Sequence, residues 1–556
     1  MANCAYKARR WHIIAHKFVQ CAFLLYFCRR LEQYIRNMRK FILTSALVLA
    51  SAGSAVAGGY LTNTNQSVSY LRNPARLATF SLDGAYSNPA GLAWIGEGWH
   101  ISFTGQNAAQ DRDILSTYDF FAGNVNQLGN NTKLFHGEAS APFIPSLDAA
   151  YQKGPWTVSM HFGITGGGGK ATFNGGLPMF ESQVAVLPTL LAGKGLNADA
   201  YDCDMYMQGR QYIYGIQLGL TYKIFENYGA LKQGLSAHLG ARMNFASNHY
   251  EGYLRNISAR LNGQMVGLNG YFAQQSAHYT DLAGQANGAA TQFDALAGTT
   301  TDPAQAEIYR QQAEAYRQQA AQAEGAATQF GALAAQTADM ELNCDQKGWG
   351  IAPIIGLDYR IGHLNLGARY EFQTSMNIEN KTKINTTGIA SFQHGVNTPN
   401  DIPALLSIGA QYDITPKWRV MAGWNTYFDK KAGMAGHKEK TLRHNTHEIT
   451  AGMEYDILDR LTISGGYKNT DYGTSDAFQS DLSFICDSYS LGFGLKVGIT
   501  SKCNIEAAYF WTTYKDYKKE TEHVLDPNHP VETTFTQTDI YSRTNKVFGL
   551  GVTYNF

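Results

Sequence analysis

Few residue combinations in this chain could carry catalysis or bind a metal. The run from Gly163 to Ala171 (GITGGGGKA) has the glycines and the lysine of a phosphate-binding loop. That motif needs Gly where Ile164 stands and Ser or Thr where Ala171 stands, so we interpret the run as a flexible hinge between a strand and a loop. His444 and His447 are three residues apart, but they lie in a loop-to-strand segment, where this spacing does not favour a metal site. The sequence therefore predicts no cofactor and no metal site.

Two cysteines could form a disulfide. Cys203 and Cys344 each precede an Asp, and each lies just before a predicted strand. We expect them at the extracellular ends of the fourth and sixth strands, where mobile loop ends could bring two Cα atoms within about 7 Å. The sequence predicts this bridge, and two free thiols are the alternative.

The composition is typical of a transmembrane β-barrel. The 556 residues include 45 Lys+Arg and 45 Asp+Glu, so the formal net charge is zero, which argues against a nucleic-acid binder with a broad basic surface. Charged residues are only 16%, whereas Tyr (33), Phe (28) and Gly (56) are frequent. The mean hydropathy of −0.27 excludes a bundle of many membrane helices. Long strands with one wet face and one apolar face have this composition.

The N-terminus carries the features of an export signal. Residues 38–57 contain Met-Arg-Lys, an apolar run and an Ala-Val-Ala cleavage site in the right order, which predicts a signal peptide cut before Gly58. We interpret residues 1–37 as an upstream extension that is absent from the mature protein. A membrane anchor over residues 12–28 is the alternative, but His16 and Lys17 interrupt that short segment.

From residue 99 to residue 556 the chain alternates as strands do. In the segment 364–371 (LNLGARYE) every second residue is apolar, and Arg369 and Glu371 share the opposite face with Gly367. A soluble core would not bury those charges, but a wet lumen can hold them. Tight turns alternate with long polar loops, and about fourteen strands can be counted, so both ends of the barrel sequence face the periplasm. The fold class is an all-β transmembrane barrel.

A helical insertion interrupts the strands at about residues 265–338. The hexapeptide GAATQF occurs at 288–293 and again at 325–330. Asp302-Pro303 is a good N-cap and N1 pair, which predicts two helices, at about 265–297 and 303–338, projecting from an extracellular loop. Two roles for these helices remain open: a solvated spacer, or a lid or partner-binding surface at the channel mouth.

Residues 58–98 are too irregular for a membrane strand. An irregular segment at membrane depth must be buried in protein or line a wet cavity. This segment joins the first strand at Trp99, so we expect it to enter the lumen as a hatch. Asn88, Pro89 and Ala90 would then lie inside the barrel, and a simple turn before the first strand is the alternative.

Three segments carry a resemblance to a known family. They are Asn-Pro-Ala-Gly at 88–91, the stretch 401–412 (DIPALLSIGAQY) leading into Trp-Arg-Val at 418–420, and the last strand, 547–556, which ends on Phe. In these the chain resembles the FadL/TodX family of outer-membrane transporters for long-chain fatty acids and other hydrophobic compounds. The resemblance implies a fourteen-stranded barrel, an N-terminal hatch, and lateral delivery of substrate through a gap at a kinked third strand, here residues 155–165.

The resemblance also implies a function and its site. We expect a passive channel in the outer membrane of a Gram-negative bacterium that takes up hydrophobic compounds, long-chain fatty acids first, and releases them sideways into the membrane. The expected hatch residues are Asn88, Pro89, Ala90 and Gly91, and the expected lateral-gate residues are Gly163, Gly166 and Gly167, because glycine tolerates bulges. The expected partners are a hydrophobic small molecule, outer-membrane lipid and the outer-membrane assembly machinery, with no nucleic acid and a monomeric state. A barrel acting as a rim-site hydrolase or a surface adhesin is the alternative.

Overall fold

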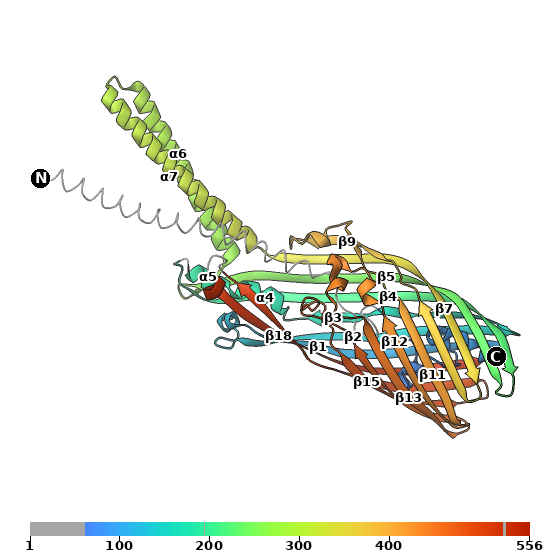
Figure 1. The fold of residues 1–556 in the computed structure, drawn as a ribbon. Coiled ribbons are helices and arrows are strands. Elements are labelled where there is room, and N and C mark those ends of the chain that lie inside the picture. The colour runs from blue at the N-terminus through green and yellow to red at the C-terminus, as the bar shows by residue number, and fades with distance from the viewer. Residues whose placement is uncertain (1–61, 194, 526–529) are drawn as a thin grey trace.

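The strands form one antiparallel sheet that closes on itself. The computed structural model describes residues 62–193, 195–525 and 530–556, so the predicted extension and signal peptide lie outside the described residues. The sheet closes because β1 (Gly98–Thr117) pairs with both β2 (Thr132–Lys153) and β18 (Thr534–Asn555). Fourteen strands make up the ring in the described part of the chain, as the sequence predicts (Figure 1).

The other strands of the ring follow β2 in chain order, and shorter strands extend the sheet at one end. The ring continues through β3 (Trp156–Phe173), β4 (Ala198–Tyr228), β5 (Gln233–Leu261), β7 (Met340–Ile361), β8 (Leu364–Glu371), β11 (Leu405–Thr415), β12 (Trp418–Tyr427), β13 (Thr446–Leu458), β14 (Leu461–Asp471), β15 (Ser488–Gly498) and β16 (Cys503–Tyr514) to β18. The short strands are β6 (Gln264–Gly267), β9 (Asn377–Asn385), β10 (Asn397–Pro399) and β17 (Tyr517–Val524).

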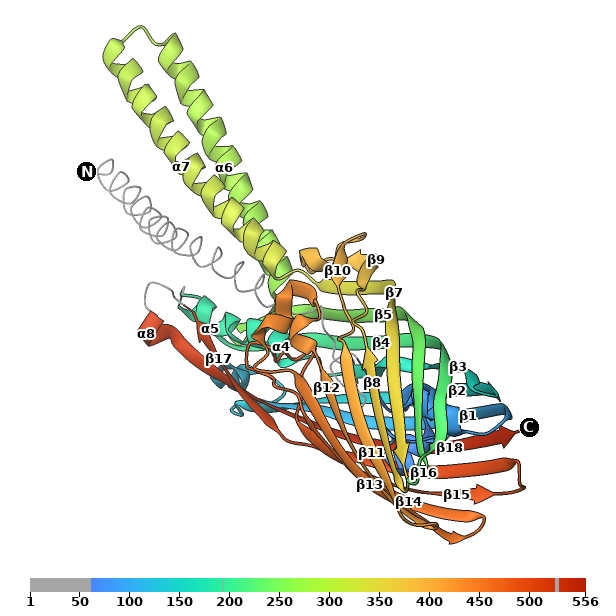
Figure 2. The same ribbon diagram turned by 45° about the vertical axis from the view of Figure 1, so that its right-hand side comes forward.

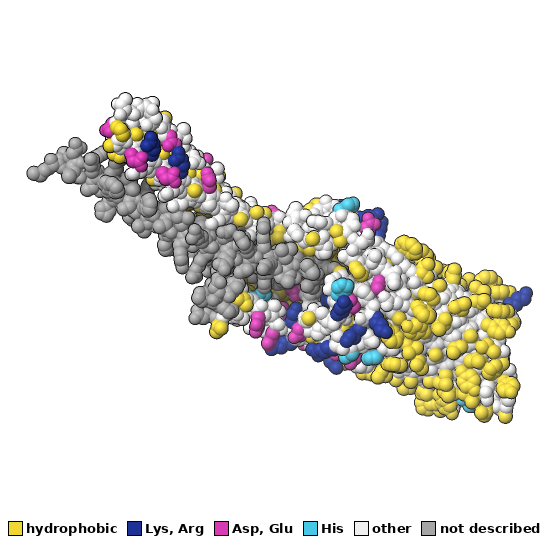
Figure 3. All heavy atoms as spheres, turned by 45° about the horizontal axis from the view of Figure 1, so that its top comes forward, with side chains coloured by type: hydrophobic (Ala, Val, Ile, Leu, Met, Phe, Trp, Pro, Cys, Tyr) yellow, Lys and Arg dark blue, Asp and Glu magenta, His cyan; other side chains and the backbone are white. Residues whose placement is uncertain are grey.

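The apolar face of each strand points outward. In β8, Leu366 is 40% exposed, whereas Arg369 and Glu371 are 2% and 1% exposed and point into the ring. A soluble sheet protein would have the reverse arrangement, because its apolar face would form the core. Figure 3 shows hydrophobic side chains covering the end of the barrel away from the helical hairpin, with charged side chains gathered between that band and the hairpin. An outward apolar band of this kind is what a transmembrane barrel presents to lipid.

Two long helices project from the other end of the ring. They are α6 (Leu268–Thr299) and α7 (Pro303–Gln336), which pack antiparallel beside each other (Figures 1 and 2). Asp302 caps α7 by accepting a hydrogen bond from the backbone N–H of Ala304 at 2.9 Å. The repeated hexapeptide places Phe293 against Tyr316 of the opposite helix. None of the described helices combines the length and the apolar character that crossing a bilayer demands.

Residues 62–94 lie inside the ring. They form α2 (Val68–Arg72), α3 (Gly84–Ser87) and the 3₁₀ helix η1 (Pro89–Trp94), which pack against inward-facing side chains of the surrounding strands. Ser67 caps α2 by accepting a hydrogen bond from the backbone N–H of Tyr70 at 3.0 Å. The remaining helices lie in loops: η2 (Asp119–Gly123), α4 (Pro178–Ala185), α5 (Leu187–Ala192), η3 (Ala390–Phe392), η4 (Asp429–Lys431), η5 (Ala435–Thr441) and α8 (Pro530–Thr533).

Candidate functional site

β2 and β3 separate midway along their length. Their pairing runs from Lys153 opposite Trp156 to Leu147 opposite Phe162, and it resumes only at Ser140 opposite Lys170. Residues 141–146 and 163–169 thus have no partner across this seam of the described sheet. On its other side β3 stays paired with β4, although the register shifts twice between residues 164 and 169.

Glycine permits the path that β3 takes here. Gly167 has a φ of +77° and Gly169 a φ of +105°, which residues with a side chain rarely adopt. A side chain at Gly167 would also meet the backbone carbonyl of Gln211 on β4. Gly166, the other predicted gate glycine of this run, lies between the two register shifts. Gly169 belongs to the same run of glycines, 166–169.

The start of the N-terminal segment fills this gap, and we define residues 62–66 as the gap segment. The backbone N–H of Asn63 donates to the carbonyl of Thr165 at 2.8 Å, and the amides of Asn63 and Gln66 donate to the carbonyl of Ile164 at 3.0 and 2.8 Å. On the β2 side, the Ser146 hydroxyl donates to the carbonyl of Gln66 at 2.5 Å. The gap segment therefore takes the place of β2 along the kinked part of β3.

The predicted gate residue Gly163 lies where β3 passes the gap segment. A side chain there would meet the side-chain oxygen of Gln66 and the ring of His161. The two ring nitrogens of His161 lie 2.7 Å from Asp148 Oδ1 on β2 and 3.2 Å from Gln66 Oε1. One buried histidine thus links β2, β3 and the gap segment at the lower end of the gap.

The Asn-Pro-Ala-Gly motif lies inside the ring against β4, β5 and β7. Asn88 is 1% exposed, and its amide donates to Asp358 Oδ2 of β7 at 2.6 Å and to the carbonyl of Thr79 at 2.9 Å. The carbonyls of Pro89 and Ala90 accept hydrogen bonds from two hydroxyls of the wall, those of Thr221 and Ser236. A side chain at Gly91 would meet Asn88 and the carbonyl of Thr79. Each motif residue thus has a defined contact within the interior.

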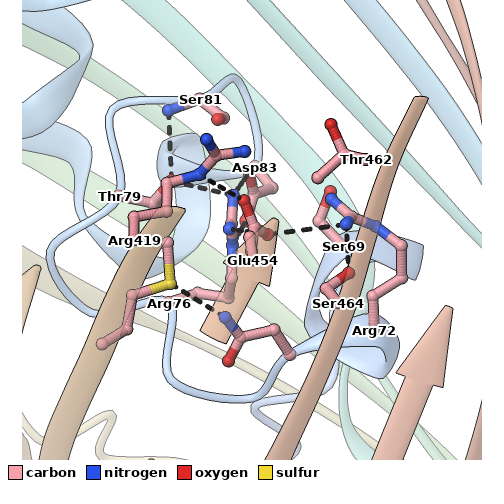
Figure 4. A network of polar contacts seen from close by, with 12 residues as sticks. Ser69, Arg72, Arg76, Thr79, Ser81, Asp83, Arg419, Glu454, Thr462 and Ser464 are labelled. Carbon is pink, nitrogen blue, oxygen red and sulfur yellow. Dashed lines mark hydrogen bonds and ion pairs between the residues drawn. The ribbon is translucent and has the colours of Figure 1, made fainter. Parts of the chain in front are cut away.

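Buried ion pairs join α2 and the turn after it to the barrel wall (Figure 4). Arg76 contacts Glu454 of β13 at 2.9 Å and Asp83 at 2.9 Å. Glu454 also accepts a hydrogen bond from Arg419 of β12 at 2.8 Å, and Arg72 pairs with Glu506 of β16 at 3.3 Å. Buried charges are tolerated only when they are paired in this way, so the network fixes this part of the segment to three strands.

Two buried arginines lie over the ring of Tyr86 at the end of α3. The guanidinium carbons of Arg242 and Arg369 are 5.0 and 4.8 Å from the ring centroid. Arg242 pairs with Glu371, and Arg369 donates to the carbonyl of Tyr86. Nε and Nη1 of Arg242 and Nε of Arg369 have no hydrogen-bond partner among the described residues. Buried donors of this kind are suited to a carboxylate. The alternation predicts that Arg369 faces inward, but no sequence signal pointed to Arg242.

The predicted disulfide between Cys203 and Cys344 is wrong. Both cysteines are free thiols. Cys203 lies in β4 beside the Asp202–Ser258 pair, and Cys344 lies in β7 opposite Tyr250. The strand β5 separates β4 from β7, and the two positions differ in height along it, so a bridge cannot form. The described residues also contain no group of three His, Cys, Asp or Glu side chains suited to a metal ion.

Sequence comparisons give no relative for this chain: no family model matches it, and no curated protein matches it. Structure comparison shows chains with a similar fold. The crystal structure of a Pseudomonas aeruginosa FadL homologue superimposes with a TM-score of 0.54 and 14% identity, over 90% of this chain and 100% of the other. The chain has a FadL-type fold. That part of the prediction is confirmed.

Two toluene transporters are looser structural neighbours. TodX of Pseudomonas putida aligns over 86% of this chain and 94% of its own, with 14% identity and a TM-score of 0.43. TbuX of Ralstonia pickettii aligns over 87% of this chain and 98% of its own, with 12% identity and a TM-score of 0.42.

Proposed function

We propose that this FadL-type barrel is a passive channel of the Gram-negative outer membrane that takes up hydrophobic compounds and releases them sideways into the membrane. The observation that carries the proposal is the interruption between β2 and β3, which, among the residues that the structure describes, the gap segment fills. A closed barrel wall has no need of such a seam, whereas a lateral exit requires one. In the proposed channel the helical hairpin is extracellular and both ends of the barrel sequence are periplasmic. Uptake through the channel involves no enzymatic step and no cofactor.

We propose that opening moves the gap segment alone and leaves the rest of the hatch in place. The gap segment is held mainly by hydrogen bonds, which contribute about 1 kcal/mol each. The ion pairs of Arg72 and Arg76 hold the following residues, and breaking a buried pair costs about 3–5 kcal/mol. Displacing residues 62–66 is therefore the cheaper movement. It would uncover the seam beside Gly163, Gly166 and Gly167 without emptying the lumen.

We propose a long-chain fatty acid as the ligand. Arg242 and Arg369 present three buried nitrogen donors that have no hydrogen-bond partner among the described residues. A carboxylate would satisfy donors of this kind with charge-assisted hydrogen bonds, whereas a neutral hydrocarbon would leave them unsatisfied. The arginines lie over the ring of Tyr86, whose hydroxyl donates to the carbonyl of Asn63 in the gap segment at 3.1 Å.

A reversible lock on the gap segment tests the proposal. Thr62 and Gly166 face each other across an isolated bridge, so the double variant Thr62→Cys/Gly166→Cys should form a disulfide on oxidation. We expect the oxidised double variant to lose uptake of radiolabelled oleate into cells and to regain it after reduction. The single variant Thr62→Cys serves as the matched control. Wild-type uptake by the fully oxidised double variant would overturn the proposal.

A further inference from the structure

Exposed cations lie on the outside of the barrel around the upper end of the β2–β3 gap. Lys170 of β3 and Arg210 of β4 are direct cross-strand partners, and Lys170 ends the gap because it is paired again with Ser140 of β2. The same register row continues through Ala109 of β1 to Lys546 of β18. Adjacent strands are about 4.8 Å apart, so the row from Lys546 to Arg210 spans about 19 Å. We call Lys170, Arg210 and Lys546 the cationic row.

The charges of the cationic row are not used within the protein. Among the described residues, none of the three forms an ion pair, although all three are exposed. The acidic side chains in the next row outward are already engaged. Asp111 accepts a hydrogen bond from the Thr544 hydroxyl at 2.8 Å, and Glu138 lies 3.5 Å from the ring of His136. The three cations of the row are therefore exposed and form no ion pair within the part of the chain that the structure describes.

An exposed apolar surface lies below the cationic row and begins at Phe548, two residues from Lys546 in β18. Phe103 of β1, Phe143 of β2 and Phe548 of β18 are 47%, 58% and 49% exposed, and the rings of the first two lie 6.3 Å apart. Cations immediately above apolar side chains match a molecule whose charged group is joined to hydrocarbon chains. In the proposed orientation this level is the outer leaflet, where phosphates lie above acyl chains.

We propose that this surface binds a phosphorylated glycolipid of the outer leaflet, of the lipopolysaccharide type. Its phosphates would contact Lys170, Arg210 and Lys546, and its acyl chains would cover the phenylalanines below. The bound lipid would then lie across β18, β1, β2, β3 and β4, over the outside of the β2–β3 gap. This inference rests on the proposed membrane orientation but not on the identity of the transported compound.

Binding to purified full-length protein in detergent tests the inference. We would titrate deep-rough lipopolysaccharide, the same lipopolysaccharide after enzymatic removal of its phosphates, and inorganic phosphate, and follow binding by native mass spectrometry. The triple variant Lys170→Ala/Arg210→Ala/Lys546→Ala should bind the phosphorylated lipid at least about tenfold more weakly than wild type, since each surface cation contributes to anionic-lipid binding. The triple variant Lys153→Ala/Lys417→Ala/Lys502→Ala, at the short turns, is the matched control and should bind as wild type does.

Three results would overturn the inference. They are equal binding by the cationic-row variant and wild type, equal binding of phosphorylated and dephosphorylated lipid, and binding of inorganic phosphate as tight as that of the lipid. Oleate transport into vesicles made without lipopolysaccharide should be the same for wild type and the cationic-row variant. That measurement separates the two proposals, because it reports on the channel when no glycolipid is present.

Discussion

At the scale of single residues, Glu454 is central to the ion pairs that join the N-terminal segment to the barrel wall. It contacts Arg76 at 2.9 Å and Arg419 at 2.8 Å, and Arg72 lies 3.5 Å away. Its side chain is 4% exposed. Removing it would leave three arginines close together with one fewer negative charge, in an interior that cannot solvate them.

The variant Glu454→Ala should therefore lower the free energy of unfolding by about 3–5 kcal/mol, because uncompensated buried charge is costly. Urea unfolding in lipid vesicles, followed by tryptophan fluorescence, would measure the loss. Asp459→Ala is the matched control, because Asp459 is 95% exposed and its contact with Lys417 is 3.8 Å long. Exposed pairs contribute about 0–1 kcal/mol. Equal losses for the two variants would contradict the anchoring role of the network.

At the scale of elements, a carboxylate links two loops at the end of the barrel that carries the hairpin. Asp481, in the β14–β15 loop, accepts hydrogen bonds from the backbone N–H of Met179 at the start of α4, at 2.7 Å, and from the Tyr541 hydroxyl at 2.8 Å. Burial raises the pKa of Asp481 to about 7, and the carboxylate of Asp539 adds to this effect. The folded loops thus bind a proton that the unfolded chain releases at about pH 4.

Because the pKa of Asp481 is higher in the folded state, the stability of this loop contact should fall as pH rises from about 4 to 7. We expect the hydrogen-exchange protection factors of residues 472–487, which are corrected for the intrinsic pH dependence of exchange, to be larger at pH 5 than at pH 8. In Asp481→Asn, which carries no titratable group at this position, the difference should disappear. Retention of the full pH difference in that variant would show that another group is responsible.

The helical hairpin is an element whose removal the barrel should tolerate. In the described structure α6 and α7 pack mainly on each other, and α6 meets the barrel near the ends of β5 and β6. Replacing residues 268–336 with a short Gly-Ser linker should leave heat-modifiable migration and oleate uptake within about twofold of wild type, since long surface insertions add little to stability. A large loss of uptake in a correctly assembled barrel would favour the lid interpretation over the spacer interpretation.

At the scale of the whole molecule, we expect the N-terminal segment to decide whether the ring is open. A ring of fourteen strands is wider than its own side chains can fill. Deleting residues 62–85 removes the gap segment, α2, Arg72 and Arg76, so it should raise the permeability of proteoliposomes to small sugars. Liposome swelling would measure this, with the hairpin deletion as the control. Unchanged permeability of an assembled barrel would contradict the hatch.

The sequence by itself determined the barrel and the direction of its faces. Alternation is a local property, since successive side chains of a strand point to opposite sides whatever the strand pairs with. Segment 364–371 was enough to predict that Leu366 faces out and that Arg369 faces in. The helical insertion and the Asn-Pro-Ala-Gly motif were likewise visible as local patterns.

Only the tertiary structure decided which residues meet inside the ring. The contacts that fill the gap and anchor the hatch join residues 101 and 378 positions apart, as in Asn63–Ile164 and Arg76–Glu454. Strand register sets such contacts, and a one-residue shift reverses every face, so no local pattern specifies them. The same reason explains the two failures of sequence reasoning. The sequence-based prediction paired Cys203 with Cys344 although a strand lies between them. It also missed Arg242, which meets Tyr86 only once the barrel has closed.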